Sequence, residues 1–145
     1  MPSLPGSSVT FRRVPADFDR RAIERFARRL EVEVAQGRPF DCLLAGDAEL
    51  RRLNCKFLGK DYATDVLSFP GPRPPAPGPC ASLGDIAISP AVAKRNAKTN
   101  KRALPEELQI LILHGLLHLL GYDHETDHGE MNRIEMRFRR RLGIA

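Results

Sequence analysis

The run from Ile110 to Leu120 constrains the fold of this chain most strongly. It is the most apolar run in the sequence, and two histidines, His114 and His118, interrupt it. A helix that is apolar on nearly all sides is stable only where other elements cover it. The run is too short to cross a bilayer. It therefore predicts a buried central helix that holds two imidazoles rigidly.

The spacing of the histidines favours a metal site. His114 and His118 are four residues apart, which places both imidazoles on one face of a helix. Gly121 can adopt the left-handed conformation that ends a helix, and the turn after it would bring His124 back to face the other two. The alternative is a pair of hydrogen-bonded core histidines, but this segment holds three of the chain's four. The pattern predicts three neutral imidazoles around one ion, with the open fourth position of a catalytic zinc site. We expect the fourth histidine, His128, to face solvent.

The same spacing occurs in the metzincin protease motif H-E-x-x-H-x-x-G-x-x-H. In those proteases the Glu after the first His is the general base, whereas this chain has Gly115 there. This chain therefore keeps the spacing of the metal ligands but lacks the general base of the peptidases. Peptide hydrolysis by that route is therefore disfavoured.

Three segments carry a resemblance to a known family. Residues 114–124, HGLLHLLGYDH, are similar to the signature of the YbeY family, zinc-dependent endoribonucleases of ribosomal RNA maturation. Residues 64–70, TDVLSFP, and 83–89, LGDIAIS, also resemble that family, in its order and with similar spacing. The likeness covers roughly residues 40–140.

The resemblance implies a single-strand-specific endoribonuclease with one zinc ion per chain, bound by His114, His118 and His124. It also implies ribosomal RNA and the small ribosomal subunit as partners, with a ribosomal protein or a GTPase as a further one. A zinc-activated water and a full positive charge would suit an anionic phosphodiester. The residues identify no general base: Asp85 and Asp123 are candidates only because they lie in or beside these segments. Asp85 could instead fix a histidine tautomer.

Basic residues supply the candidates for RNA contact. The densest basic cluster before the C-terminus lies within residues 94–102. The chosen candidates for phosphate contact are Lys56, Lys60, Lys94, Arg95 and Lys98. A solvated helix face is the alternative.

Length and charge fit this interpretation. The chain has 145 residues, which suits one domain over 1–145, and a net charge of +5 favours an acidic partner such as nucleic acid. Its three cysteines, Cys42, Cys55 and Cys80, show no paired spacing, so disulfides are not expected. No signal peptide or membrane span is evident, and we expect a cytoplasmic protein.

The pattern of apolar residues predicts an α+β fold with α/β-type layers, a mixed four-stranded sheet and about five helices. The strands are expected at residues 9–14, 40–45, 65–69 and 83–89. Asp47 and Ser89 are expected to cap helices. Residues 1–8 are expected to be a loose tail and the Pro-rich residues 70–80 a loop. The residues expected on inner helix faces are Leu50, Leu53 and Phe57, and then Met131, Ile134, Phe138 and Leu142.

Two other classes of function stay open. One is a ribosome-associated RNA-binding protein whose zinc is structural. The other is a metallohydrolase of another substrate, such as peptide, against which Gly115 argues.

The chain departs from the family at one position, which yields a prediction. The family usually has an arginine where Leu58 follows residues 53–57, LNCKF. Lys56 or Lys60 could supply the charge, but a lysine is a point charge and not a bidentate fork. If the family's arginine acts on RNA, Leu58→Arg will raise the rate of RNA cleavage. An unchanged rate in the same cleavage assay would mean that this position does not limit activity here.

Overall fold

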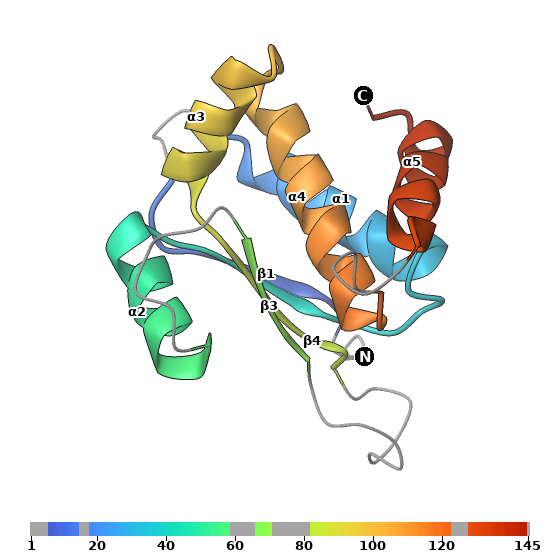
Figure 1. The fold of residues 1–145 in the computed structure, drawn as a ribbon, viewed down its shortest axis with the longest axis horizontal. Helices are drawn as coiled ribbons and strands as arrows, with labels where there is room; N and C mark the ends of the chain where they lie inside the picture. The colour runs from blue at the N-terminus through green and yellow to red at the C-terminus, as the bar shows by residue number, and fades with distance from the viewer. Residues whose placement is uncertain (1–5, 15–17, 59–65, 71–81, 123–127, 145) are drawn as a thin grey trace.

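The computed structural model describes residues 6–14, 18–58, 66–70, 82–122 and 128–144. Within these residues it has four strands and five helices (Figure 1). Along the chain they are β1 (Ser8–Phe11), α1 (Arg20–Glu33), β2 (Asp41–Leu44), α2 (Asp47–Leu58), β3 (Val66–Pro70), β4 (Gly84–Ile88), α3 (Pro90–Thr99), α4 (Leu104–Leu119) and α5 (Glu130–Leu142). The expected α+β fold, with a four-stranded sheet and five helices, is confirmed.

The strands form one mixed sheet in the order β1-β2-β4-β3. β1, β2 and β4 pair in parallel, and β3 pairs antiparallel with β4. Helices α1, α4 and α5 lie over one face of this sheet and α2 lies over the other (Figure 1). Because side chains alternate along a strand, each strand contributes to both layers. In β4, Ile86 and Ile88 join the large core beneath α4, while Ala87 joins a smaller cluster with Leu50 of α2.

Helix α4 is the centre of the large core, as the sequence predicted. Five of its aliphatic side chains are fully buried: Leu108, Ile112, Leu113, Leu116 and Leu117. Burying each such side chain contributes roughly 1.5–3 kcal/mol. Pro105 lies in its first turn. Gly121 follows its end with a φ of +105°, in the left-handed region that the sequence pattern required.

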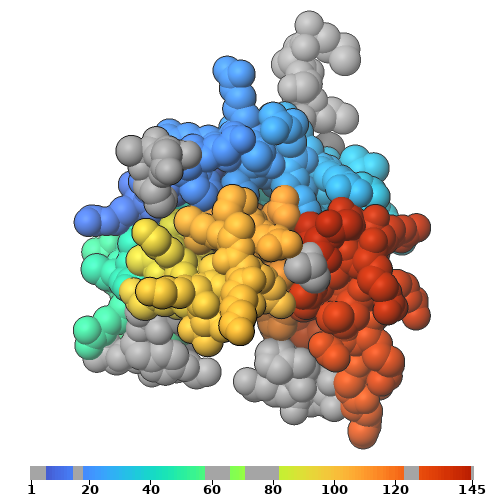
Figure 2. Space-filling model, turned by 90° about the horizontal axis from the view of Figure 1, so that it is seen from above, coloured from blue at the N-terminus to red at the C-terminus, as the bar shows by residue number. Residues whose placement is uncertain are grey.

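The C-terminal helix closes this layer against α1. Its inner face buries Met131 and Leu142, with Ile134 and Phe138 partly buried against the same core. Arg29 of α1 donates from Nη1 to the carbonyl oxygen of Leu142, at 3.1 Å. Figure 2 shows α1 (blue) and α5 (red) meeting on the surface. The inner face predicted for this helix is thus buried or partly buried throughout.

The N-terminal residues differ from the expected loose tail. β1 begins at Ser8, and Ser7 is held by three hydrogen bonds. Its N–H and hydroxyl both donate to Glu31, and the hydroxyl accepts from the N–H of Phe40. Residues 1–5 lie outside the described part of the chain, as do residues 71–80 of the expected Pro-rich loop. The start of β1 is therefore fixed to α1.

Phe57 also differs from its prediction. It was expected on the inner face of α2, but 58% of its surface is exposed. Leu50 is fully buried under this helix, and Leu53 is partly buried. The ring of Phe57 lies edge-on to that of Phe69, with centroids 5.4 Å apart. Leu50 and Leu53, from earlier turns of α2, already fill the small apolar cluster under this helix. Phe57, in the last turn, therefore lies at the edge of the cluster.

No helix in the described part of the chain is long and apolar enough to cross a membrane.

The beginnings of α2 and α3 are tied together by one side-chain pair. Ser89 caps α3, accepting from the N–H of Val92 at 3.2 Å, and its hydroxyl also donates to Asp47, the first residue of α2. Arg95 donates to the same carboxylate at 3.3 Å. The hydrogen bond from Ser89, aided by Arg95 and opposed by desolvation, holds the pKa of Asp47 below its usual value.

Ser89→Ala tests this link. Losing the cap should lower the free energy of unfolding by about 1 kcal/mol. Losing the bond to Asp47 adds a pH-dependent part. Because the folded-state pKa is lowered, this part is present above the pKa of an unfolded aspartate and is lost as the pH falls through the folded value.

Urea unfolding at pH 7 and at about pH 3 should therefore show a larger gap between wild type and Ser89→Ala at pH 7. Thr99→Ala, at the exposed end of the same helix, is the control and should change little at either pH. An equal gap at both pH values would contradict the role given to Asp47.

Candidate functional site

His114 and His118 converge on one face of α4. Their Nε2 atoms lie 3.2 Å apart, and their rings meet edge to face at 80°, with centroids 4.8 Å apart. Both side chains are half-buried. Two imidazole nitrogens directed at one point are a suitable pair of ligands for a single ion. The helical spacing predicted this convergence.

The other ring nitrogen of His114 is bound by a glutamate from α5. Nδ1 of His114 lies 2.6 Å from Oε1 of Glu135, and Oε2 of that carboxylate lies 3.6 Å from Nη1 of Arg139. Only 8% of the surface of Glu135 is exposed. The Nδ1 side of His114 is therefore engaged by protein, and its Nε2 side is turned towards His118.

The sequence analysis missed Glu135, although a signal was present. Glu135 lies four residues after Met131 and one after Ile134, within the inner face of the last helix. A carboxylate at an inner helical position is expensive to bury unless it has a partner. That cost could have identified it as a partner of a basic or metal-binding group.

At Gly115, α4 lies close against the sheet. A Cβ built on Gly115 would lie 2.8 Å from Cγ2 of Ile86 in β4, closer than real contacts allow. The hydroxyl of Ser68 in β3 donates to the carbonyl oxygen of Gly115 at 3.1 Å. The residue after the first histidine therefore faces the sheet and has no room for a side chain. A metzincin-type glutamate could not be accommodated here without displacing Ile86.

Asp85 lies on the other face of the sheet from the histidines. It precedes Ile86 in β4, so its side chain points to the α2 side while Ile86 points to α4. It pairs in register with Asp41 of β2 and Phe69 of β3. Desolvation, and then the nearby charge of Asp41, raise the pKa of Asp85 above its usual value. The structure does not bring Asp85 together with His114, whose Nδ1 partner is Glu135.

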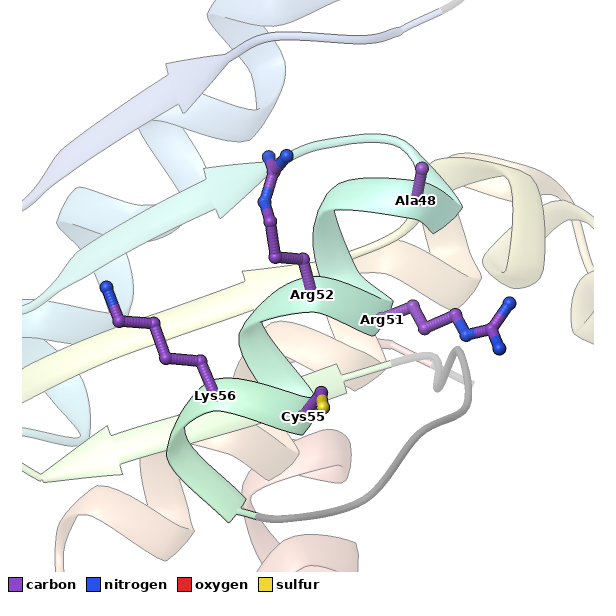
Figure 3. Close-up of a pocket in the computed structure, with 5 residues that line it drawn as sticks. All are labelled: Ala48, Arg51, Arg52, Cys55 and Lys56. Carbon is purple, nitrogen blue, oxygen red and sulfur yellow. The ribbon is translucent and has the colours of Figure 1, made fainter.

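The basic candidates are dispersed over the surface. Lys94 and Lys98 are exposed on α3, and Arg95 beside them is paired with Asp47. Lys56 lies on the outer side of α2 (Figure 3), where an open hollow is lined by Ala48, Arg51, Arg52, Cys55 and Lys56. All five residues belong to one helix on the far side of the sheet from His114. This hollow is therefore separate from the histidine pair.

The remaining candidates are only partly covered by the structure. His124, Asp123 and Lys60 lie outside the described residues. Among the residues that are described, no group of three possible metal ligands converges. His128 has a side chain that is 95% exposed, as expected, and Tyr122 packs against the main core. The described part of the site thus consists of His114, His118 and the carboxylate behind them.

The close approach at Gly115 makes a testable prediction. Gly115→Ala gains about 1 kcal/mol of helix propensity but forces a methyl group into Ile86, at a cost of about 1–3 kcal/mol. We expect a net fall in the free energy of unfolding, measured by urea denaturation. In a double-mutant cycle with Ile86→Ala, the two losses should be less than additive, because the second change removes the clashing methyl. Strict additivity would argue against the contact.

Comparisons with known proteins identify the family of this chain. The family described as Endoribonuclease YbeY matches residues 12–143. The Endoribonuclease YbeY of Solibacter usitatus is 57% identical over 144 residues, covering 99% of this chain and 93% of the relative. That of Nautilia profundicola is 45% identical and covers 72% of each chain. The solution structure of TM1509 from Thermotoga maritima superposes with a TM-score of 0.60 at 26% identity, covering 91% of this chain and 85% of the other.

The family match covers most of the chain, and the Solibacter relative is similar over nearly its whole length. The resemblance inferred from three short segments therefore extends over the strands and helices that hold the histidine pair. The chain belongs to the YbeY family of endoribonucleases.

Proposed function

We propose that this protein is a zinc-dependent endoribonuclease that hydrolyses phosphodiester bonds of single-stranded ribosomal RNA during ribosome maturation. Membership of the YbeY family supports the nuclease role in rRNA processing. The main support for a metal site is the convergence of Nε2 of His114 and Nε2 of His118, which lie 3.2 Å apart. His124, which follows the turn at Gly121, is the proposed third ligand.

The residues present suit a catalytic ion. Zinc bound there would supply a Lewis acid that activates water near neutral pH. His114 and His118 are neutral donors when they bind a metal, so the ion keeps its full charge for an anionic substrate. Their backbone belongs to the most deeply buried helix, which limits their movement. This chain's contribution is therefore to fix two imidazoles in one orientation.

Gly115 favours RNA over peptide as the substrate. Peptidases with this histidine spacing use a glutamate at that position as general base. Here a side chain would meet Ile86 at 2.8 Å, so the position serves packing instead. A metallohydrolase acting on peptide would need its base from elsewhere.

The exposed lysines of α3 are the proposed contacts for the RNA backbone. Lys94 and Lys98 are four residues apart and exposed on the same side of the helix. Arg95, whose guanidinium is paired with Asp47, is less available. Lys56 offers a further charge on α2, and Lys60 follows in the sequence. Such contacts are independent of sequence and weaken as salt rises.

An rRNA substrate implies a set of partners. We place the activity in one domain over residues 1–145, acting in the cytoplasm on the small ribosomal subunit. A ribosomal protein or a GTPase would guide it to the RNA. The net charge of +5 suits a partner rich in phosphate.

Single-turnover cleavage of a structured rRNA fragment tests the proposal. Wild-type protein loaded with zinc should cut the RNA and hold about one ion per chain. His114→Ala and His118→Ala should lose cleavage to background and retain well below one ion, because each removes a ligand. His128→Ala is the matched control: it makes the same substitution at an exposed histidine and should behave like wild type.

Two results would favour the alternatives. Wild-type protein that holds one zinc per chain but never cuts RNA would support a ribosome-associated binding protein whose zinc is structural. Cleavage of casein that disappears in His114→Ala would support a peptidase instead.

A further inference from the structure

We propose that Glu135 is the positioning residue of the metal site, a role that rests on the proposed function. Its carboxylate accepts a hydrogen bond from Nδ1 of His114 and so fixes the tautomer in which Nε2 carries the lone pair that can bind a metal. Arg139 in turn holds the carboxylate in place. The C-terminal helix α5 thereby sets the orientation of a ligand on α4.

The hydrogen bond itself decides the tautomer. Glu135 Oε1 lies 2.6 Å from Nδ1 of His114, a short separation of the kind that a charged acceptor favours. An ionised carboxylate can only accept, so the proton between them belongs to Nδ1. A neutral imidazole protonated at Nδ1 has its lone pair on Nε2, the nitrogen that faces His118 at 3.2 Å.

The carboxylate is held by one partner at each of its oxygens. Its other oxygen lies 3.6 Å from Nη1 of Arg139, one turn further along α5. The side chains of Glu135 and Arg139 are each only 11% exposed. Met131, four residues before Glu135, is buried in the main core and fixes this part of the helix. A carboxylate held in this way does not move with the ring of His114, so it can limit the rotation of that ring.

The position of Glu135 is difficult to explain by stability alone. It lies on the inner face of an amphipathic helix, among apolar side chains. Well-packed apolar side chains are often as stabilising as a buried ion pair, or more so, because charges are costly to desolvate. A carboxylate kept at such a place, in contact with a candidate metal ligand, points to a role in the site. Carboxylates behind metal-binding histidines commonly act in this way.

The zinc affinity of the 145-residue chain, measured by competition with a chromogenic chelator, tests the inference. Glu135→Ala should bind zinc about 10–100-fold more weakly than wild type. The zinc affinity of Glu135→Gln should lie between those of wild type and Glu135→Ala, since the amide oxygen can still accept a hydrogen bond from Nδ1 but carries no charge. This order distinguishes loss of positioning from a general loss of structure.

Glu107→Gln is the matched control. Glu107 is also buried, at 4% exposed, and is paired with Arg102 at 3.1 Å, but it lies about two turns before His114 on α4. The same substitution there should leave zinc affinity at the wild-type value, whatever it does to the melting temperature. Equal losses in both variants would mean that a buried charge matters only for folding, and would overturn the proposal.

The tautomer gives a second readout that needs neither zinc nor activity. The ¹⁵N spectrum of the imidazoles at neutral pH should show His114 protonated at Nδ1 in metal-free wild type. Glu135→Ala should show a mixture of tautomers. Protonation of His114 at Nε2 in the wild type, or unchanged zinc affinity in Glu135→Ala, would reject the inference. Wild type that neither binds zinc nor cuts RNA would reject the proposed function, while the spectrum would still show whether Glu135 fixes the tautomer of His114.

Discussion

The close approach of α4 to the sheet at Gly115 is the contact on which the rest of the site depends. The absent side chain lets the helix backbone lie against Ile86, and the bond from Ser68 to the Gly115 carbonyl fixes the rotation of the helix. With this face turned to the sheet, His114 is turned towards α5. The buried leucines of α4 then fill the space between the sheet and the outer helices. The absence of a side chain at Gly115 thus determines the directions in which the side chains of His114 and His118 point.

The second constraint couples the end of the chain to this helix. Glu135 meets His114 across 21 positions of sequence, and the same helix is tied to α1 through Arg29 and Leu142. Burying a carboxylate is costly, and the cost is offset here by Arg139 and by the imidazole. The C-terminal helix is therefore part of the candidate site and not only a cover for the core. Changes in the packing of α5 would therefore alter the hydrogen bond at Nδ1 of His114.

Strand alternation separates residues that one sequence segment brings together. Asp85 and Ile86 are neighbours in β4, yet Asp85 shares a face with Asp41 and Phe69 while Ile86 supports the histidine helix. Successive strand residues point to opposite faces, so membership of a short motif does not place a side chain in the site. This is why Asp85 does not meet His114, whereas Glu135 on a distant helix does.

The sequence by itself determined what depends on residues a few positions apart. The convergence of His114 and His118, the cap at Ser89 and the left-handed turn at Gly121 follow from helix geometry and backbone preference, and each is found. Only the tertiary structure decided the contacts between distant segments: Glu135 on His114, Ser7 on Glu31, and the exposure of Phe57. Local periodicity shows which face of a helix is apolar, but not which element covers it or how far that cover extends. The partner of a buried polar side chain is therefore fixed by packing between elements, which spacing along one element does not encode.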